Sequence, residues 1–77
     1  MRSRPTLCYD ILREIRREAG RHKEARSIFV NTTPAIADLL YGPQFNDLEG
    51  LEAEIGRPVV IRAQSHFHPE QYEVYAR

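Results

Sequence analysis

The chain has 77 residues, and its 11 Lys and Arg residues balance its 11 Asp and Glu residues. The net charge is therefore zero, which excludes attraction of nucleic acid or an anionic membrane by the charge of the chain as a whole. A chain this short forms one domain and buries only about 60–65% of the surface that its unfolded form exposes, so we expect its stability to need a partner or a larger parent chain. A single cysteine excludes an internal disulfide, and no long apolar run is present, so we expect a soluble, cytoplasmic protein with no membrane segment.

The first predicted element is a helix that runs from about residue 4 to Gly20. Pro5 fits its first turn, where a missing backbone N–H costs nothing, and Gly20 fits the C′ position after the last turn. Five apolar residues recur every three or four positions and form a stripe about 100° wide, the usual width of a face packed on a core. They are Cys8, Ile11, Leu12, Ile15 and Ala19.

The segment Ser27–Asn31 is the strand around which we expect the domain to be organised. Its apolar residues, Ile28, Phe29 and Val30, form an uninterrupted run with polar residues at both ends. A run without polar alternation is typical of a strand covered on both faces. The sequence therefore predicts a buried central strand, with Phe29 in a fully covered site.

Two short helices are predicted after this strand. Thr33 can cap the first with its hydroxyl, Pro34 fits the first helical position, and the pattern continues to about Tyr41. Asn46 can cap the second, with a glutamate three residues on as in a capping box. Gly56 is expected to end the second helix.

The remaining chain contains two strand patterns, residues 59–63 after Pro58 and the alternating residues 72–76. Strands joined through helices are expected to be parallel, whereas the last two patterns are close enough in sequence for an antiparallel hairpin. The sequence thus predicts one domain, residues 1–77, of the α/β (α+β) class. Its expected element order is α-β-α-α-β-β, with a three-stranded mixed sheet covered by helices.

Few residues have the type and spacing that catalysis or metal binding requires. Cys8 lies on the apolar stripe, where burial raises a thiol pKa and lowers its reactivity, so we expect a core role. His66 and His68 have ligand-like spacing, but a metal site needs a third or fourth ligand, and the available Glu70 and His22 belong to no motif. We therefore predict no catalytic, cofactor-binding or metal-binding residues in this chain.

One flank of the first helix is basic and could contact phosphates. Tyr9 lies among its members on the helical wheel and could stack on a base. A charged helix flank is more often only solvated, and acids balance this one nearby, so RNA contact is the alternative hypothesis rather than the leading one. The residues concerned are Arg13, Arg16, Arg17 and Arg21.

The closing strand predicts an interface with another protein surface. Alternation places Tyr75 and Glu73 on the face opposite to the other residues of 72–76. That face needs cover, and a terminal strand also presents an unpaired edge. We expect contacts with a second subunit or a parent domain through Tyr75, Glu73 and the adjoining loop residues His66 and His68.

Five segments carry a family resemblance: Thr6–Ile15, Phe29–Val30, Thr33–Ala37, Glu54–Val59 and Pro69–Val74. In their order and spacing they resemble the small C-terminal domain of the ribonuclease E/G family. The likeness covers nearly all of residues 5–76. The run Cys8-Tyr9-Asp10 is most similar to the ribonuclease G branch of that family.

The resemblance implies a parent protein that is a magnesium-dependent endoribonuclease. Such an enzyme cuts single-stranded, AU-rich RNA, prefers 5′-monophosphorylated ends, and acts in ribosomal-RNA maturation and mRNA decay. The resemblance places its catalytic aspartates in a nuclease domain upstream. Paired cysteines before the small domain hold a zinc ion between subunits in the family, and Cys8 does not match that motif.

The resemblance also implies what the small domain itself does. In the family it is similar to a thioredoxin-like fold without the redox cysteines, and it serves packing and subunit association. We therefore expect this chain to be a fragment of a larger protein and a non-catalytic C-terminal oligomerisation domain. Its expected partners are the parent nuclease domain and a second subunit, with RNA met through the parent.

Overall fold

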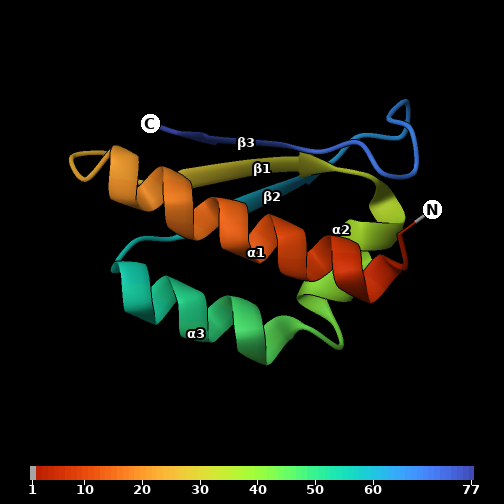
Figure 1. Ribbon diagram of the computed structural model, residues 1–77, viewed down its shortest axis with the longest axis horizontal. Helices are drawn as coiled ribbons and strands as arrows, with labels where there is room; N and C mark the ends of the chain where they lie inside the picture. The colour runs from red at the N-terminus through yellow and green to blue at the C-terminus, as the bar shows by residue number, and fades with distance from the viewer. Residues whose placement is uncertain (1) are drawn as a thin grey trace.

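The computed structural model describes residues 2–77 and has the predicted element order, α-β-α-α-β-β (Figure 1). Among these residues, none of the helices combines the length and the apolar character needed to cross a bilayer. The elements are α1 (Arg4–Arg21), β1 (Ile28–Thr32), α2 (Pro34–Tyr41), α3 (Phe45–Ile55), β2 (Val59–Ala63) and β3 (Glu73–Ala76).

The three strands form a mixed sheet in the order β2-β1-β3, so β1 is the central strand as predicted. It runs parallel to β2 and antiparallel to β3. The predicted hairpin between the last two strands is wrong, because β3 pairs with the opposite edge of β1. Side chains occupy the free edge of β2: Glu52 accepts a hydrogen bond from the Val59 N–H at 2.7 Å, and the Tyr41 hydroxyl donates to the Ile61 carbonyl at 3.4 Å.

The helices cover only one face of this sheet. Along β1, Ile28, Val30 and Thr32 are buried, whereas Phe29 and Asn31 on the other face are half-buried. Helix α1 packs on β1 and β3, α2 packs on β2, and α3 packs on α1 and α2, as Figure 1 shows. The predicted cover on both faces of β1, including a fully covered Phe29, is therefore wrong. An apolar residue can also be shielded by side chains of neighbouring strands, and Phe29 is shielded in that way.

The core lies between the sheet and the helices. It contains the predicted stripe of α1, the inward residues of β1, and apolar residues from both short helices and β2. Three residues from the end of the chain, Tyr72, Val74 and Ala76, pack against its margin. The buried core residues are Leu7, Cys8, Ile11, Leu12, Ile15, Ala19, Ile28, Val30, Ile36, Ala37, Leu40, Leu48, Leu51, Val59 and Ile61.

Side-chain caps begin two of the helices. The Ser3 hydroxyl accepts from the Thr6 N–H at the start of α1, and Thr33 accepts from the Ile36 N–H at the start of α2, where Pro34 is the first helical residue. These oxygens pair with backbone N–H groups that a helix leaves unpaired. The predicted place of Pro5 in the first turn of α1 and the predicted cap at Thr33 are thus confirmed.

Two predicted helix ends differ from the structure. Helix α1 continues past Gly20, because the His22 N–H still donates to the Glu18 carbonyl at 3.0 Å. Helix α3 begins before Asn46, because its first helical hydrogen bond runs from Leu48 to the Gln44 carbonyl, so Asn46 lies inside the helix and caps nothing. Gly56 ends α3 as predicted, with the left-handed φ of 69° that glycine tolerates best.

One guanidinium group joins the C-terminal ends of α1 and α3. Arg57 donates to the Ala19 carbonyl at 3.0 Å and the His22 carbonyl at 2.7 Å, with a longer contact of 3.4 Å to the Ala25 carbonyl. It also donates to the Ile55 carbonyl at 3.2 Å. Carbonyls at helix C-termini lack partners within the helix and carry partial negative charge, so a cation that reaches several of them stabilises both ends together.

The one-sided cover can be tested with a matched pair of valines. Val30→Ala removes two methyl groups from a fully buried site, and we expect it to lower the free energy of unfolding by about 2 kcal/mol. Val60→Ala makes the same chemical change on the open face, where Val60 is half-buried, and should cost less than half as much. Chemical denaturation followed by circular dichroism measures both. Equal losses would contradict the assignment of the two faces.

The Arg57 contacts predict a specific order of stability. Arg57→Ala leaves several carbonyls without their charged donor and should cost about 2–3 kcal/mol. Arg57→Lys keeps the charge but loses the planar fork, so it should fall between the wild type and the alanine variant. Lys23→Ala, at an exposed lysine of the nearby turn, is the control and should change the unfolding midpoint little. A lysine variant as stable as the wild type would show that charge alone accounts for the effect.

Candidate functional site

The open face of the sheet carries a row of apolar side chains. The strand register places Val60, Phe29 and Tyr75 side by side across β2, β1 and β3. The Phe29 and Tyr75 rings stack with centroids 5.3 Å apart and an interplanar angle of 11°. Offset stacking of this kind is a favourable arrangement of aromatic pairs.

Two arginines flank the aromatic pair. The guanidinium carbon of Arg62 lies 5.2 Å from the centroid of the Phe29 ring, and that of Arg77 lies 5.2 Å from the centroid of the Tyr75 ring. Both distances are within the range of cation–π attraction. The face thus presents a line of arginine, phenylalanine, tyrosine and arginine, in which the two aromatic rings are half-buried and both arginines are exposed.

Polar residues fill the part of the open face that adjoins this row. Asn31 donates from its amide nitrogen to Glu73 at 3.1 Å, and Gln64 donates to the Asn31 amide oxygen at 3.1 Å. Glu73 is exposed, and Tyr75 lies on the same face two residues further along β3. The predicted alternation of the closing strand is therefore confirmed, whereas a contact of Tyr75 and Glu73 with another protein stays a prediction.

The loop that joins β2 to β3 holds both remaining residues of the predicted interface. The His66 ring meets the Phe67 ring edge-on with centroids 5.1 Å apart, and the His68 N–H donates to the Gln71 side chain at 3.1 Å. Figure 1 shows this loop at the end of the sheet near the N-terminus. Among residues 2–77, no hydrogen bond or ring contact joins either histidine to Tyr75 or Glu73, so the structure does not bring the four residues into one cluster.

A hollow of about 340 Å³ lies beside this loop, between the first turns of α1 and α2. Loop residues on both sides of the histidines line it, and so do charged groups of both signs. The lining residues are Arg2, Arg4, Leu7, Thr33, Pro34, Ala35, Ile36, Ser65, Phe67, Pro69 and Glu70.

All four arginines proposed for RNA contact lie within ion-pair distance of carboxylates. Arg16 on α1 makes two hydrogen bonds to Glu54 on α3, at 2.6 and 3.1 Å. The hydrogen bond from Arg16 and its positive charge hold the pKa of Glu54 below its ordinary value, and Glu54 in turn raises the pKa of Arg16.

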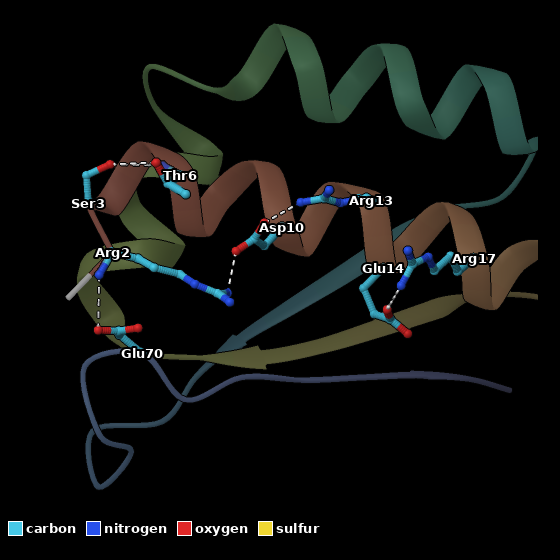
Figure 2. Close-up of polar contacts among 8 residues, drawn as sticks. All are labelled: Arg2, Ser3, Thr6, Asp10, Arg13, Glu14, Arg17 and Glu70. Atoms are coloured by element: carbon cyan, nitrogen blue, oxygen red, sulfur yellow. Dashed lines mark hydrogen bonds and ion pairs between the residues drawn. The ribbon is translucent and has the colours of Figure 1, made fainter.

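The other three arginines pair along α1 itself. Arg13 bonds to Asp10, and Arg17 lies 3.7 Å from Glu14 (Figure 2). Arg21 bonds to Glu18 at 2.8 Å. Figure 2 also shows Arg2 reaching Asp10 with its side chain and Glu70 with its backbone nitrogen. The flank is therefore a mixed-charge surface rather than a face of one sign.

Cys8 is the residue considered for thiol chemistry, and the histidines are the residues considered for metal binding. Cys8 is a free, fully buried cysteine in the core, as predicted, and burial raises its pKa. Among residues 2–77, no three His, Cys, Asp or Glu side chains come together closely enough to hold a metal ion.

The structure adds residues that the sequence prediction of the site left out. The apolar run places Phe29 in the core, yet in the structure it is the partner of Tyr75 on the open face. Strand alternation could have indicated Arg62, because it lies two residues after Val60 and therefore on the same face. Arg57 lies within the family-like segment Glu54–Val59, and its role in joining two helix ends depends on contacts that are distant in sequence.

Fold and surface together define a small α/β domain whose sheet has helices on one face and a row of half-buried aromatic rings and exposed arginines on the other. Comparison with known proteins finds no matching family model. It does find similarity to ribonuclease G of Escherichia coli strain K12, with 32% identity over 69 residues. The ribonuclease G proteins of Shigella flexneri and Salmonella typhimurium strain SL1344 match at the same identity and length.

These matches cover 90% of this chain but only 14% of the length of each ribonuclease G. The chain is thus distantly similar to one segment of ribonuclease G. This confirms the likeness to ribonuclease G that the five sequence segments indicated.

The Arg16–Glu54 pair generates a pH-dependent prediction. Because Glu54 has a lowered pKa in the folded protein, its contribution to stability is present above its ordinary pKa of 4.5 and is lost as the pH falls through the folded value. Glu54→Gln should therefore lower the thermal midpoint slightly at neutral pH, and the difference from the wild type should vanish in acid. Glu49→Gln, an exposed carboxylate on the same helix, is the control. A difference that persists unchanged in acid would contradict the ion-pair explanation.

Proposed function

We propose that this chain is the non-catalytic C-terminal packing and oligomerisation domain of a ribonuclease G/E-like endoribonuclease that processes ribosomal RNA and mRNA. Similarity along 90% of the chain to a segment of ribonuclease G supports the relationship. The small share of ribonuclease G that is matched, 14%, supports a role as one part of a larger protein.

The observation that carries the proposal is the open face of the sheet. A domain of this size has few apolar residues beyond those of its core, yet Phe29, Tyr75 and Val60 lie on the face opposite to the three helices of the described chain. Aromatic residues and arginine are also the types most enriched at the centres of protein interfaces. Contact with a second subunit or with the parent nuclease domain would complete the cover of this face.

In this proposal, the domain and the rest of the protein have different roles. Magnesium-dependent cleavage and the zinc ion between subunits belong to the parent chain, and RNA is met there. The domain contributes Tyr75, Glu73, His66 and His68 to contacts with its protein partners. The expected location of the whole protein is the cytoplasm.

The alternative, an RNA-contacting module that uses Arg13, Arg16, Arg17 and Arg21, is less well supported by the charges around these residues. Each guanidinium lies within 4 Å of a carboxylate, and Arg16 is held by two hydrogen bonds. A phosphate would have to displace these carboxylates or bind beside them, where their charge repels it. The open face is therefore the better candidate surface.

The proposal predicts that the purified chain associates without cleaving RNA. With magnesium present, we expect no cleavage of a 5′-monophosphorylated single-stranded RNA, with E. coli ribonuclease G as the positive control. Sedimentation over a range of concentrations should show self-association that Tyr75→Arg weakens. Tyr9→Arg makes the same change at an exposed site on α1, away from the sheet face, and should not weaken it.

Two outcomes would contradict this proposal. Magnesium-dependent cleavage that survives further purification would show that the chain is catalytic. A monomeric chain that binds RNA with a steep salt dependence would favour the arginine flank instead.

A further inference from the structure

The outer edge of β3 presents backbone groups that have no hydrogen-bond partner within residues 2–77. In an antiparallel pair, a residue either exchanges both backbone hydrogen bonds with the residue opposite or directs both groups away. Ser27 and Arg77 exchange both bonds, at 3.0 and 3.1 Å. In the same register, the backbone N–H and C=O groups of Tyr75 and Glu73 point toward β1. Those of Val74 and Ala76 therefore point away from the sheet. Among residues 2–77 no hydrogen bond reaches these four groups.

The two edges of the sheet differ in this respect. On the β2 edge, Glu52 accepts a hydrogen bond from the Val59 N–H, and the Tyr41 hydroxyl donates one to the Ile61 carbonyl. On the β3 edge, the backbone groups have no partner among the described residues, and Figure 1 shows none of the elements of residues 2–77 beyond β3. An open edge of this kind accepts an added strand through main-chain hydrogen bonds.

The charges of β3 fit a second copy of the same strand. For two copies to pair antiparallel through their outer groups, Val74 and Ala76 must face outward-directed residues of the partner. Two-fold registers centred on residue 74, 75 or 76 all pair outward-directed residues with one another, and the one centred on residue 75 is the one that pairs Val74 with Ala76 of the partner subunit, so that both residues bond within β3. Only the register centred on Tyr75 places Glu73 opposite Arg77 of the partner subunit, and Arg77 opposite the partner's Glu73.

The same register brings the two tyrosines together. Tyr75 then faces the partner's Tyr75 at a pair without backbone hydrogen bonds, where opposed side chains lie closest. The registers centred on residues 74 and 76 instead place Tyr75 opposite a charged residue, Glu73 or Arg77 of the partner subunit. Opposite charges and paired aromatic rings both favour cross-strand contact. The register centred on Tyr75 is therefore the one in which all the facing side chains on the open face attract each other.

We infer that β3 pairs with β3 of a second copy, antiparallel and centred on Tyr75, to form one continuous six-stranded sheet across a two-fold axis. The inference rests on the proposed association function and specifies its partner and geometry. The aromatic row of each open face would meet its copy at the axis. Where α1 adjoins the start of β3, Asp10, Glu14 and Arg17 carry both signs of charge, so two copies of this surface would not repel one another through a charge of one sign.

A charge-exchange experiment tests the register. Glu73→Arg alone and Arg77→Glu alone each place like charges opposite one another twice in the dimer, so each should weaken self-association by about tenfold or more. The double variant Glu73→Arg/Arg77→Glu restores opposite charges and should associate like the wild type. An equimolar mixture of the two single variants should also form a heterodimer more readily than either forms a homodimer.

Three further measurements separate pairing from simple loss of fold. Circular dichroism should show that both single variants remain folded. Glu49→Arg reverses a charge at an exposed residue of α3, a helix that packs on α1 and α2, and it should leave association unchanged. Amide exchange of Val74 and Ala76 should slow as the concentration of the wild type rises, because dimerisation takes up these N–H groups.

The outcomes distinguish this inference from the proposed function. A wild-type chain that stays monomeric up to millimolar concentration would overturn the strand pairing, while contact with the parent nuclease domain could still be measured separately. Self-association that both single variants retain would overturn the register and leave an oligomerisation role in place. RNA cleavage by the chain would overturn the proposed function, whatever the result for the strand.

Discussion

The arrangement of the domain depends on the Arg57 guanidinium and the carbonyls around it. This group links the end of α1, the following turn and the end of α3, so it fixes the positions from which β1 and β2 start. The Ile28 N–H donates to the Pro58 carbonyl one residue after Arg57, which begins the parallel ladder. Helix ends and sheet register are therefore set at one place. A lysine there could not reach several carbonyls with a planar fork.

One-sided helical cover accounts for most of the remaining features. Three helices on one face are enough to bury a continuous core, and the opposite face is shielded by its own side chains. Ring stacking between Phe29 and Tyr75, with an arginine at each side, reduces the exposure of both rings without a further layer of structure. The face is thus partly protected in the isolated domain and remains available to a partner.

Local signals predicted the elements well, and long-range signals predicted their neighbours less well. Helix α2 and strand β2 begin and end where Pro34, Tyr41 and the run after Pro58 indicated, because caps and apolar runs act within a few residues. The partner of β3 could not be predicted in the same way. Closeness in sequence favoured β2, whereas the side chains of Glu52 and Tyr41 occupy that edge. For the candidate site, period-two alternation correctly placed Tyr75 and Glu73 on one face, but an unbroken apolar run could not show that Phe29 joins them.

The packing of the first helix against the last strand has a consequence for how the chain folds. Strand β1 is made early, yet it pairs with residues far along the chain, as the 42-residue separation of Asn31 and Glu73 illustrates. Contacts this distant in sequence slow folding, because a long loop must close before they form. During synthesis, α1 and β1 would leave the ribosome with their apolar surfaces unpaired, and the domain could close only after β3 had followed. We therefore expect the sheet to be completed late in synthesis, when β3 pairs with β1.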